Sequence, residues 1–375
     1  MNSITENFFI KKKIKYFKIN GEILEILALK SNKKNVNFEI QKFLNDLLLE
    51  SLNLTFSEKI VIWYGEVITE EIIIIFHEYF RNNCCNIQNI TFLTSTSGLK
   101  TFYKNYCSLN RSLQMDIVEI PMIDLINQYL SNLEPKKINK SLTRIFSFYG
   151  GTYEISPPMR TFLSLFLAQY KNFSSIEIMC KCCNVNNLED WLEKETFFLN
   201  SSFVKKYSDL HKTYINDDLL LSEELKIKID DNKIYNERFG KGGYQEIVDS
   251  HCIMTLVRET VNFQPFGYIS EKTFRCFYNH TIPIPVDGKE IISDLKSYGF
   301  WIDDHFFDYS YLQEDLFENK IKKLNSSIEK ITKLSYSDLT SYYNNNIENF
   351  QHNQNLVVNW PNIVDQKLKE KFDKW

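Results

Sequence analysis

The chain has 375 residues, of which 43% are apolar and 15% aromatic, so it can bury a substantial core and is long enough for two domains. A net charge of −4 and a pI near 6.0 exclude a global electrostatic attraction to nucleic acid or to anionic membranes. No secretory signal is recognisable, and the longest apolar run, Ile72–Phe76, is too short to span a bilayer. We therefore expect a cytoplasmic protein without a transmembrane segment.

The first part of the chain alternates apolar runs typical of buried strands with segments of helical periodicity. The expected strands are 59–64, 89–94 and 115–120, and the expected helices are 69–80 and 122–130. Before them, 15–29 is rich in strand formers and 38–52 has a helical pattern. Because strands and helices alternate with short connections, the pattern predicts a parallel sheet with helices on both faces.

A polar, proline-marked segment at 131–140 indicates a boundary, and a second alternating unit follows it. The expected strands of this unit are 144–149, 175–179, 252–257, 281–286 and one near 300–302, and a proline-started helix is expected over 156–170. From residue 311 onward the pattern is helical. The predicted organisation is a first domain over 1–135, a second over 141–335 and C-terminal helices over 336–375.

The segment Phe266–Val286 carries the most chemical information. Gly267 interrupts the chain, Ser270 is a suitable N-cap, and the apolar residues that follow recur at helical spacing before the strand 281–286, which prolines end. Glu271 and Lys272 therefore occupy the first helical turn, where free backbone N–H groups and the helix dipole favour an anion. A cation at this position suits a phosphate, and a neighbouring carboxylate suits sugar hydroxyls.

The pattern Tyr-Ile-Ser-Glu-Lys over 268–272, followed by Thr-Ile-Pro at 281–283, resembles the donor-binding motif of the α1,3-fucosyltransferase family. It is also similar to viral and bacterial glycosyltransferase-like proteins with a Ser-Glu-Lys helix. The resemblance implies a GT-B fold, in which two Rossmann-like domains face each other across a cleft, with a helical C-terminal tail. It further implies that Lys272 binds the donor diphosphate, that Glu271 accepts hydrogen bonds from the nucleotide ribose, and that Tyr268 belongs to the donor site. The alternative is a capped helix on which Glu271 and Lys272 are ordinary surface residues.

A second candidate element is the segment 150–160, in which a glycine pair ends a strand and a proline-started helix carries Arg160 in its first turn. Arginine is planar, always charged and bidentate, so this position suits a phosphate. The family has a Ser-Asn turn where this chain has Gly150-Gly151, and the resemblance implies that Arg160 is a diphosphate ligand. The alternative is an arginine whose stem covers an aromatic core.

Two glutamates complete the candidate site. Glu259 lies where the family has a strand ending in Phe-Glu-Asn, although Thr260 replaces the asparagine, so Glu259 is either a donor contact or a solvated loop carboxylate. An inverting transfer needs a general base in the acceptor domain, and Glu66, just after the strand 59–64, is the candidate by position. A loop glutamate without a catalytic role is the alternative for Glu66.

No metal is required in principle, because Arg160 and Lys272 can stabilise the departing diphosphate. Asp303, Asp304, His305 and Asp308 read as surface groups of one loop, and the cysteine cluster at 180–183 lacks a second ligand pair. His77 and His251 are interpreted as structural, since no nucleophile motif accompanies either of them. The expected site therefore contains no metal and no cofactor besides the donor substrate.

The sequence thus predicts a metal-independent, inverting glycosyltransferase that transfers a sugar, with fucose from GDP-fucose as the best candidate, to a hydroxyl of a glycan acceptor. Two alternatives remain open: a GT-B transferase with another nucleotide-sugar donor or acceptor, and a non-catalytic relative that binds nucleotide or glycan. Nucleic acid is not an expected partner, because no basic face with interleaved aromatic residues is visible.

Overall fold

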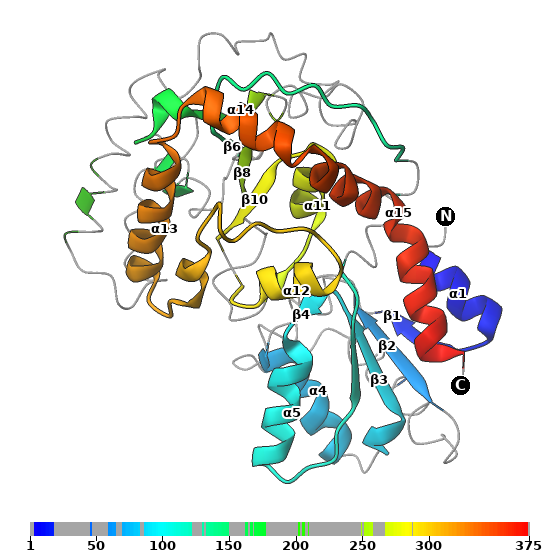
Figure 1. Ribbon diagram of the computed structural model, residues 1–375. Coiled ribbons are helices and arrows are strands. Elements are labelled where there is room, and N and C mark those ends of the chain that lie inside the picture. Colours follow the sequence, from blue (N-terminus) through cyan, green and yellow to red (C-terminus); the bar gives the residue numbers. More distant parts are fainter. Residues whose placement is uncertain are drawn as a thin grey trace. The chain divides into compact units, whose positions relative to one another are not determined.

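The protein is described by a computed structural model. The described residues are 4–18, 46, 59–64, 70–82, 86–121, 130, 133–149, 162–163, 166–167, 169–177, 202, 205–206, 209, 249, 251–257, 267–286 and 288–373. The chain divides into two compact units, each with its own four-stranded parallel sheet (Figure 1). Unit 1 comprises Met1–Asn132, Val261–Glu271 and Asn359–Trp375, and unit 2 comprises Leu133–Thr260 and Lys272–Val358.

The sheet of unit 1 has the strand order β1-β2-β3-β5, with every neighbouring pair parallel. Its strands are β1 (Lys15–Lys18), β2 (Ile60–Tyr64), β3 (Ile90–Thr94) and β5 (Asp116–Glu119). Its other elements are α1 (Ile4–Lys12), α4 (Glu70–Asn82), η1 (Ile87–Asn89), β4 (Thr96–Ser97), α5 (Leu99–Leu109) and β9 (Gly267–Tyr268). The three predicted strands and the helix 69–80 are confirmed. Of the helices expected at 38–52 and 122–130, only residues 46 and 130 are described, and both are helical.

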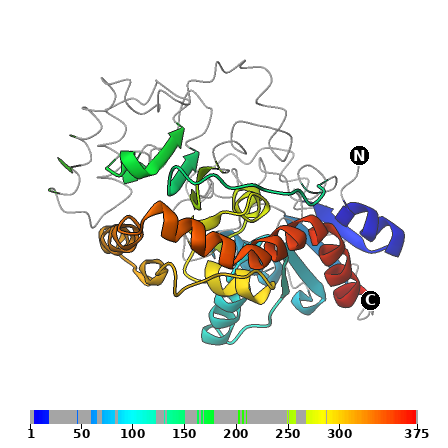
Figure 2. The same ribbon diagram turned by 45° about the horizontal axis from the view of Figure 1, so that its top comes forward.

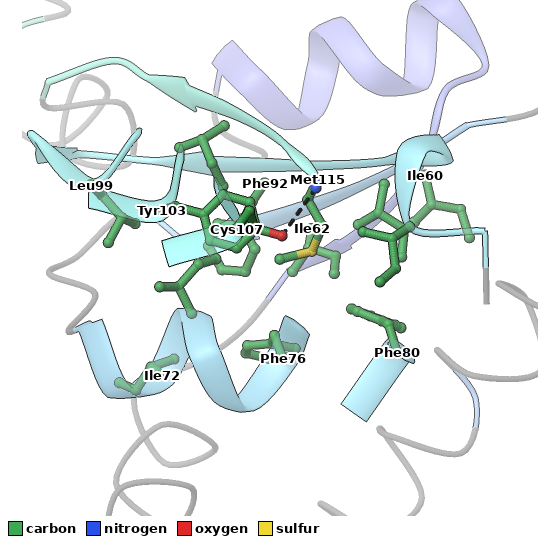
Figure 3. Packing of buried hydrophobic residues seen from close by; sticks show 14 residues of the cluster. Ile60, Ile62, Ile72, Phe76, Phe80, Phe92, Leu99, Tyr103, Cys107 and Met115 are labelled. Carbon is green, nitrogen blue, oxygen red and sulfur yellow. Dashed lines mark hydrogen bonds between the residues drawn. The ribbon is translucent and has the colours of Figure 1, made fainter. Parts of the chain in front are cut away.

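The side chains of β2 point alternately to the two faces of the sheet, and all of the described ones are buried by helices on one face or the other. Ile60 and Ile62 belong to the core between the sheet and the helices α4 and α5, which Figure 3 shows from close by. Val61 and Trp63 are equally buried but point to the other face, where the Phe9 ring of α1 lies 6.4 Å from the Trp63 ring. A strand buried on both faces reads as a continuous apolar run rather than an alternating one.

The sheet of unit 2 is also parallel, with the strand order β10-β8-β6-β7. Its strands are β6 (Phe146–Tyr149), β7 (Ser174–Glu177), β8 (Met254–Val257) and β10 (Ile282–Pro285), which confirms four of the predicted strands. The helices α11 (Glu271–Tyr278), α12 (Ile291–Ser297), α13 (Phe317–Ile331) and α14 (Tyr336–Asn345) follow in the same part of the chain. In the expected helix 156–170, the described residues 162–163 and 166–167 are helical with buried side chains, whereas 169–170 form a turn.

The edge strand β10 contains both prolines that were expected to end it. Ile282 and Val286 donate their N–H groups to Ile253 and Val257, so the backbone polar groups at positions 283 and 285 point away from β8, toward the open edge. Pro283 and Pro285 occupy those positions, where an N–H would have no partner strand. Their carbonyls accept the hydroxyls of Tyr309 (3.0 Å) and Tyr311 (2.5 Å). The edge is thereby closed to a further strand.

The helix α11 ends in a Schellman motif whose left-handed residue is a histidine. His280 has φ 56°, the Thr281 N–H donates to the Cys276 carbonyl (2.8 Å), and the His280 N–H donates to that of Phe277 (3.2 Å). Glycine is the usual residue at this position, so the sequence gives no signal for the turn. The motif directs the chain from α11 into β10 after only three residues.

The prediction of a strand near 300–302 is wrong, because these residues belong to neither a strand nor a helix. Trp301 instead exchanges backbone hydrogen bonds with one side chain of α15 (Ile347–Phe372): its N–H donates to Asn353 Oδ1 (2.7 Å), and its carbonyl accepts from Asn353 Nδ2 (2.8 Å). The Phe300 ring stacks on Phe277 with centroids 4.4 Å apart. The apolar pattern therefore reflects burial against helices, which a short run cannot distinguish from burial in a sheet.

The region after residue 311 is helical, as predicted. It contains η6 (Ser310–Gln313), which packs beside α13 (Figure 2), then α14 and the long α15 (Ile347–Phe372), which carries Pro361 inside it and contributes residues to both units. The start of α14 is fixed by a capping box, in which the Ser335 hydroxyl accepts the Asp338 N–H and the Asp338 carboxylate accepts the Ser335 N–H.

We expect Ser335→Ala to lower the free energy of unfolding by about 1 kcal/mol, because one helix-terminal N–H loses its acceptor. Urea unfolding of the variant and the wild type measures the difference. Ser335→Asp, which keeps an acceptor at the cap, serves as the control and should retain most of the stability. Equal losses in both variants would contradict the role of the cap.

Candidate functional site

The unit 2 sheet reverses its direction of growth between β6 and β8. The chain passes from β6 to β7 on one side, and then returns to build β8 and β10 on the other side. In open parallel sheets, ligands bind beyond the carboxyl ends of the two strands that flank such a reversal. Those ends are Tyr149 and Val257, and the segments that follow them begin at residues 150 and 258.

The start of α11 belongs to the same edge of this sheet. β8 and β10 are parallel neighbours and α11 precedes β10 directly, so α11 must run against the strands and begin near their carboxyl ends. Ser270 lies immediately before the helix and is buried, while Glu271 and Lys272 in its first turn are half-buried. The boundary between the two units falls between Glu271 and Lys272.

The buried stripe of α11 holds this first turn in place. Phe274 and Phe277 both pack on the Phe300 ring, with centroid distances of 5.5 and 4.4 Å. The Tyr278 hydroxyl donates to the Glu134 carbonyl (2.8 Å). With its inner face anchored, α11 presents a half-buried cation and carboxylate at its N-terminal end, where the helix dipole favours negative charge. A phosphorylated ligand is the chemistry that this arrangement suits.

Of the six residues selected from the sequence, the structure places Glu271 and Lys272 together in the first turn of α11. Tyr268 is placed by its backbone in β9, which pairs antiparallel with β4 through Thr96. Arg160, Glu259 and Glu66 lie outside the described segments. One described carboxylate at the carboxyl edge of the unit 1 sheet is that of Glu119, whose Oε1 accepts the Lys100 N–H (2.6 Å) in the first turn of α5.

A buried polar network that sequence patterns did not indicate lies at the opposite, amino end of the unit 2 sheet. Its centre is Asp249, which is fully buried and accepts hydrogen bonds from Ser147 Oγ (3.0 Å) and Asn279 Nδ2 (2.8 Å). Lys140 Nζ donates to the carbonyls of Asp249 and Cys252. Burial lowers the pKa of Lys140 to about 8, although the nearby Asp249 carboxylate opposes the shift. Because this network is remote from the carboxyl ends, its role is to hold the strand starts together.

The two histidines interpreted as structural make structural contacts. His77 is fully buried in unit 1, where its Nδ1 lies 2.7 Å from the Tyr103 hydroxyl, and burial lowers its pKa. That hydroxyl also accepts the Met115 N–H (3.0 Å), the bond drawn in Figure 3. The His251 Nδ1–H donates to the Ser141 carbonyl (3.0 Å).

The carboxylates of Asp303 and Asp304 in the loop 303–308 are bound by other groups of the protein. Asp303 Oδ1 accepts the N–H groups of His305 and Phe306, and Asp304 forms an ion pair with Lys296 that lowers the pKa of Asp304. Over the described ranges, no three His, Cys, Asp or Glu side chains are grouped closely enough to hold a metal ion. Within the same ranges, no helix is both long and apolar enough to cross a membrane.

Comparisons with known proteins identify no relative of this chain. No family model matches the chain, and neither the curated proteins nor the solved structures contain a significant match.

Proposed function

We propose that the protein is an inverting, metal-independent glycosyltransferase of the GT-B class that binds a nucleotide-diphospho-sugar, GDP-fucose being the best candidate. The observation that carries the proposal is the position of the Glu271-Lys272 turn: it begins α11 at the carboxyl edge of a parallel sheet whose strand order reverses between β6 and β8. A helix start, a cation and a carboxylate then coincide at the edge where ligands of such sheets bind.

In this mechanism, Lys272 contacts the diphosphate and Glu271 the ribose, while Tyr268 and Glu259 complete the donor site. Arg160, which follows the end of β6, provides the second diphosphate contact. Negative charge develops on the diphosphate as the bond to the sugar carbon breaks, and the two cations stabilise that charge. Glu66 removes the proton from the acceptor hydroxyl as it attacks the sugar from the opposite face.

Titration calorimetry with GDP, GDP-fucose and other nucleotide sugars tests donor binding. We expect Lys272→Ala and Arg160→Ala each to weaken GDP binding about tenfold or more, because each removes charge-assisted hydrogen bonds to phosphate. Lys296→Ala, which removes an exposed surface cation of the same unit, is the matched control and should bind as wild type. If the wild type binds no nucleotide sugar, or if both site variants bind undiminished, the proposal fails.

A turnover assay separates a transferase from a relative that only binds. Gly150-Gly151 and Thr260, where the fucosyltransferase motif has other residues, are the features that favour the second function. Release of GDP from a bound donor, with or without acceptor, establishes an enzyme. Tight binding without release over long incubation establishes a nucleotide-sugar-binding protein. A better response to another donor than to GDP-fucose changes the donor and leaves the reaction class intact.

A further inference from the structure

The turn between α5 and β5 exposes two leucines. Leu109 is 85% exposed and Leu113 is 58% exposed, whereas α5 buries its opposite face through Leu99, Tyr103 and Cys107. Single exposed apolar residues are ordinary on protein surfaces. Here two strongly exposed leucines flank one tight turn, four positions apart, and we call this feature the apolar tip. Exposed apolar surface that lies together is where proteins contact partners or membranes.

This tip has a defined backbone conformation. Arg111 adopts φ 50°, the Ser112 N–H donates to the Cys107 carbonyl (3.0 Å), and the Arg111 N–H donates to that of Ser108 (3.3 Å). These are the two hydrogen bonds of a Schellman motif at the end of α5. The fold therefore places Leu109 before this turn and Leu113 after it, and Arg111 lies between them at its left-handed position.

The surroundings of the tip are basic. The sequence from Leu99 to Met115 contains no aspartate or glutamate, and Lys104 and Arg111 are exposed. α5 runs against the parallel strands, so the tip lies at the amino edge of the unit 1 sheet, at the lower end of this unit in Figure 1. The exposed lysines Lys11 and Lys13 precede β1 and so belong to the same edge.

Three described carboxylates near this edge are each paired with a cation. Glu78 pairs with Arg81, Asp116 with Lys371 (2.6 Å), and Asp373 with Lys12 (2.7 Å). Lys11, Lys13, Lys104 and Arg111 take no part in these three pairs, and they add local positive charge that the net charge of −4 for the whole chain conceals. A partner of negative charge is the electrostatic complement.

We propose that the amino edge of the unit 1 sheet docks on an anionic lipid surface, with Leu109 and Leu113 entering the headgroup region. Basic residues near a bilayer surface attract anionic lipid, and inserted apolar side chains add an attraction that salt does not screen. A nucleic acid would satisfy the cations but would leave both leucines in water. This edge is the opposite end of the sheet from the carboxyl ends, so lipid contact leaves those ends accessible.

Co-sedimentation of the full chain with vesicles tests the proposal. We expect binding to vesicles of phosphatidylcholine with phosphatidylserine, and much weaker binding to phosphatidylcholine alone. Leu109→Ser with Leu113→Ser should weaken the binding about tenfold or more, and the loss should persist at high salt. Arg111→Gly, which keeps the left-handed turn, should combine with Lys104→Gln to weaken the binding mainly at low salt.

The matched control is Leu316→Ser with Leu334→Ser, which removes two exposed leucines (41% and 37%) from unit 2 and should bind vesicles as wild type. Nucleotide-sugar binding by each variant shows that it is folded, and it should be unchanged by substitutions at the tip. Absence of vesicle binding by the wild type overturns the proposal. Equal losses in the tip and control variants also overturn it, as does binding of duplex nucleic acid that removal of the leucines does not alter.

Discussion

Replacing Asp249 by alanine is expected to lower the free energy of unfolding by about 3–5 kcal/mol. The carboxylate is fully buried and accepts hydrogen bonds from β6 through Ser147 and from the turn after α11 through Asn279. Its removal leaves both donors without this acceptor, and it also deletes the negative charge nearest to the buried ammonium group of Lys140. Each of these effects destabilises the native state alone, and alanine causes all of them together.

Urea unfolding of Asp249→Ala, Asp249→Asn and Ser147→Ala tests this explanation. Asparagine keeps the volume and an acceptor oxygen but not the charge, so Asp249→Asn should lower the free energy of unfolding less than Asp249→Ala does. Ser147→Ala should cost about 1 kcal/mol, because Asp249 keeps the Asn279 bond and Thr255 keeps a hydroxyl partner in Thr281 (3.0 Å). A loss of less than about 1 kcal/mol in Asp249→Ala would show that the network contributes little.

The strands of both sheets were predictable from sequence because each is a short, locally defined run. β2 is apolar along its whole length, and β3 is fully buried although Thr91 and Thr94 are polar, as expected for strands covered on both faces. The same rule failed at 300–302, where the pattern is as apolar but the backbone partner is the side chain of Asn353, more than fifty positions away. An apolar pattern indicates that a segment is buried, but it does not indicate which groups form hydrogen bonds with its backbone.

The Glu271-Lys272 turn was predictable for the same local reason. A glycine, a residue suited to the N-cap and apolar residues at helical spacing all lie within one short segment. The Asp249 network was not, because Ser147 and Asp249 are separated by 102 positions and no pattern links them. The left-handed turn at His280 was missed because its sequence carries histidine where glycine is the usual signal. Long-range polar contacts and unusual residues at turns are therefore the parts of this fold that could not be predicted from the sequence.

The same histidine should make the protein sensitive to acid. His280 is 1% exposed, its Nδ1 lies 2.9 Å from the Tyr343 hydroxyl, and its Nε2 has no hydrogen-bond partner among the described residues. Burial, and secondarily the charges of Lys140 and Lys136, lower the pKa of His280 to about 3. The native state therefore keeps the imidazole neutral at pH values where the unfolded chain, with a pKa near 6.5, takes up a proton.

The direction of this pH effect on stability follows from the number of protons that the native and unfolded states bind. Above pH 6.5 both states hold the neutral imidazole, and the group does not affect the pH dependence of stability. As the pH falls from about 6.5 to about 3, the unfolded state binds one proton more, so His280 should lower the free energy of unfolding by up to about 1.4 kcal/mol per pH unit. His77, whose pKa is also lowered by burial, adds to the same trend in the wild type.

Comparison with His280→Asn isolates the effect of this one group. Asparagine tolerates the left-handed backbone, so the Schellman turn should persist, while the titrating ring and its contacts with Tyr343 and Phe350 are removed. The variant should be less stable than wild type at pH 7, but its stability should fall less steeply between about pH 6 and 4. His77 and the surface carboxylates are present in both proteins and cancel in the difference. Denaturation curves across this range measure both slopes; parallel slopes would mean that His280 is protonated in the native state, and that burial does not exclude the charge from this turn.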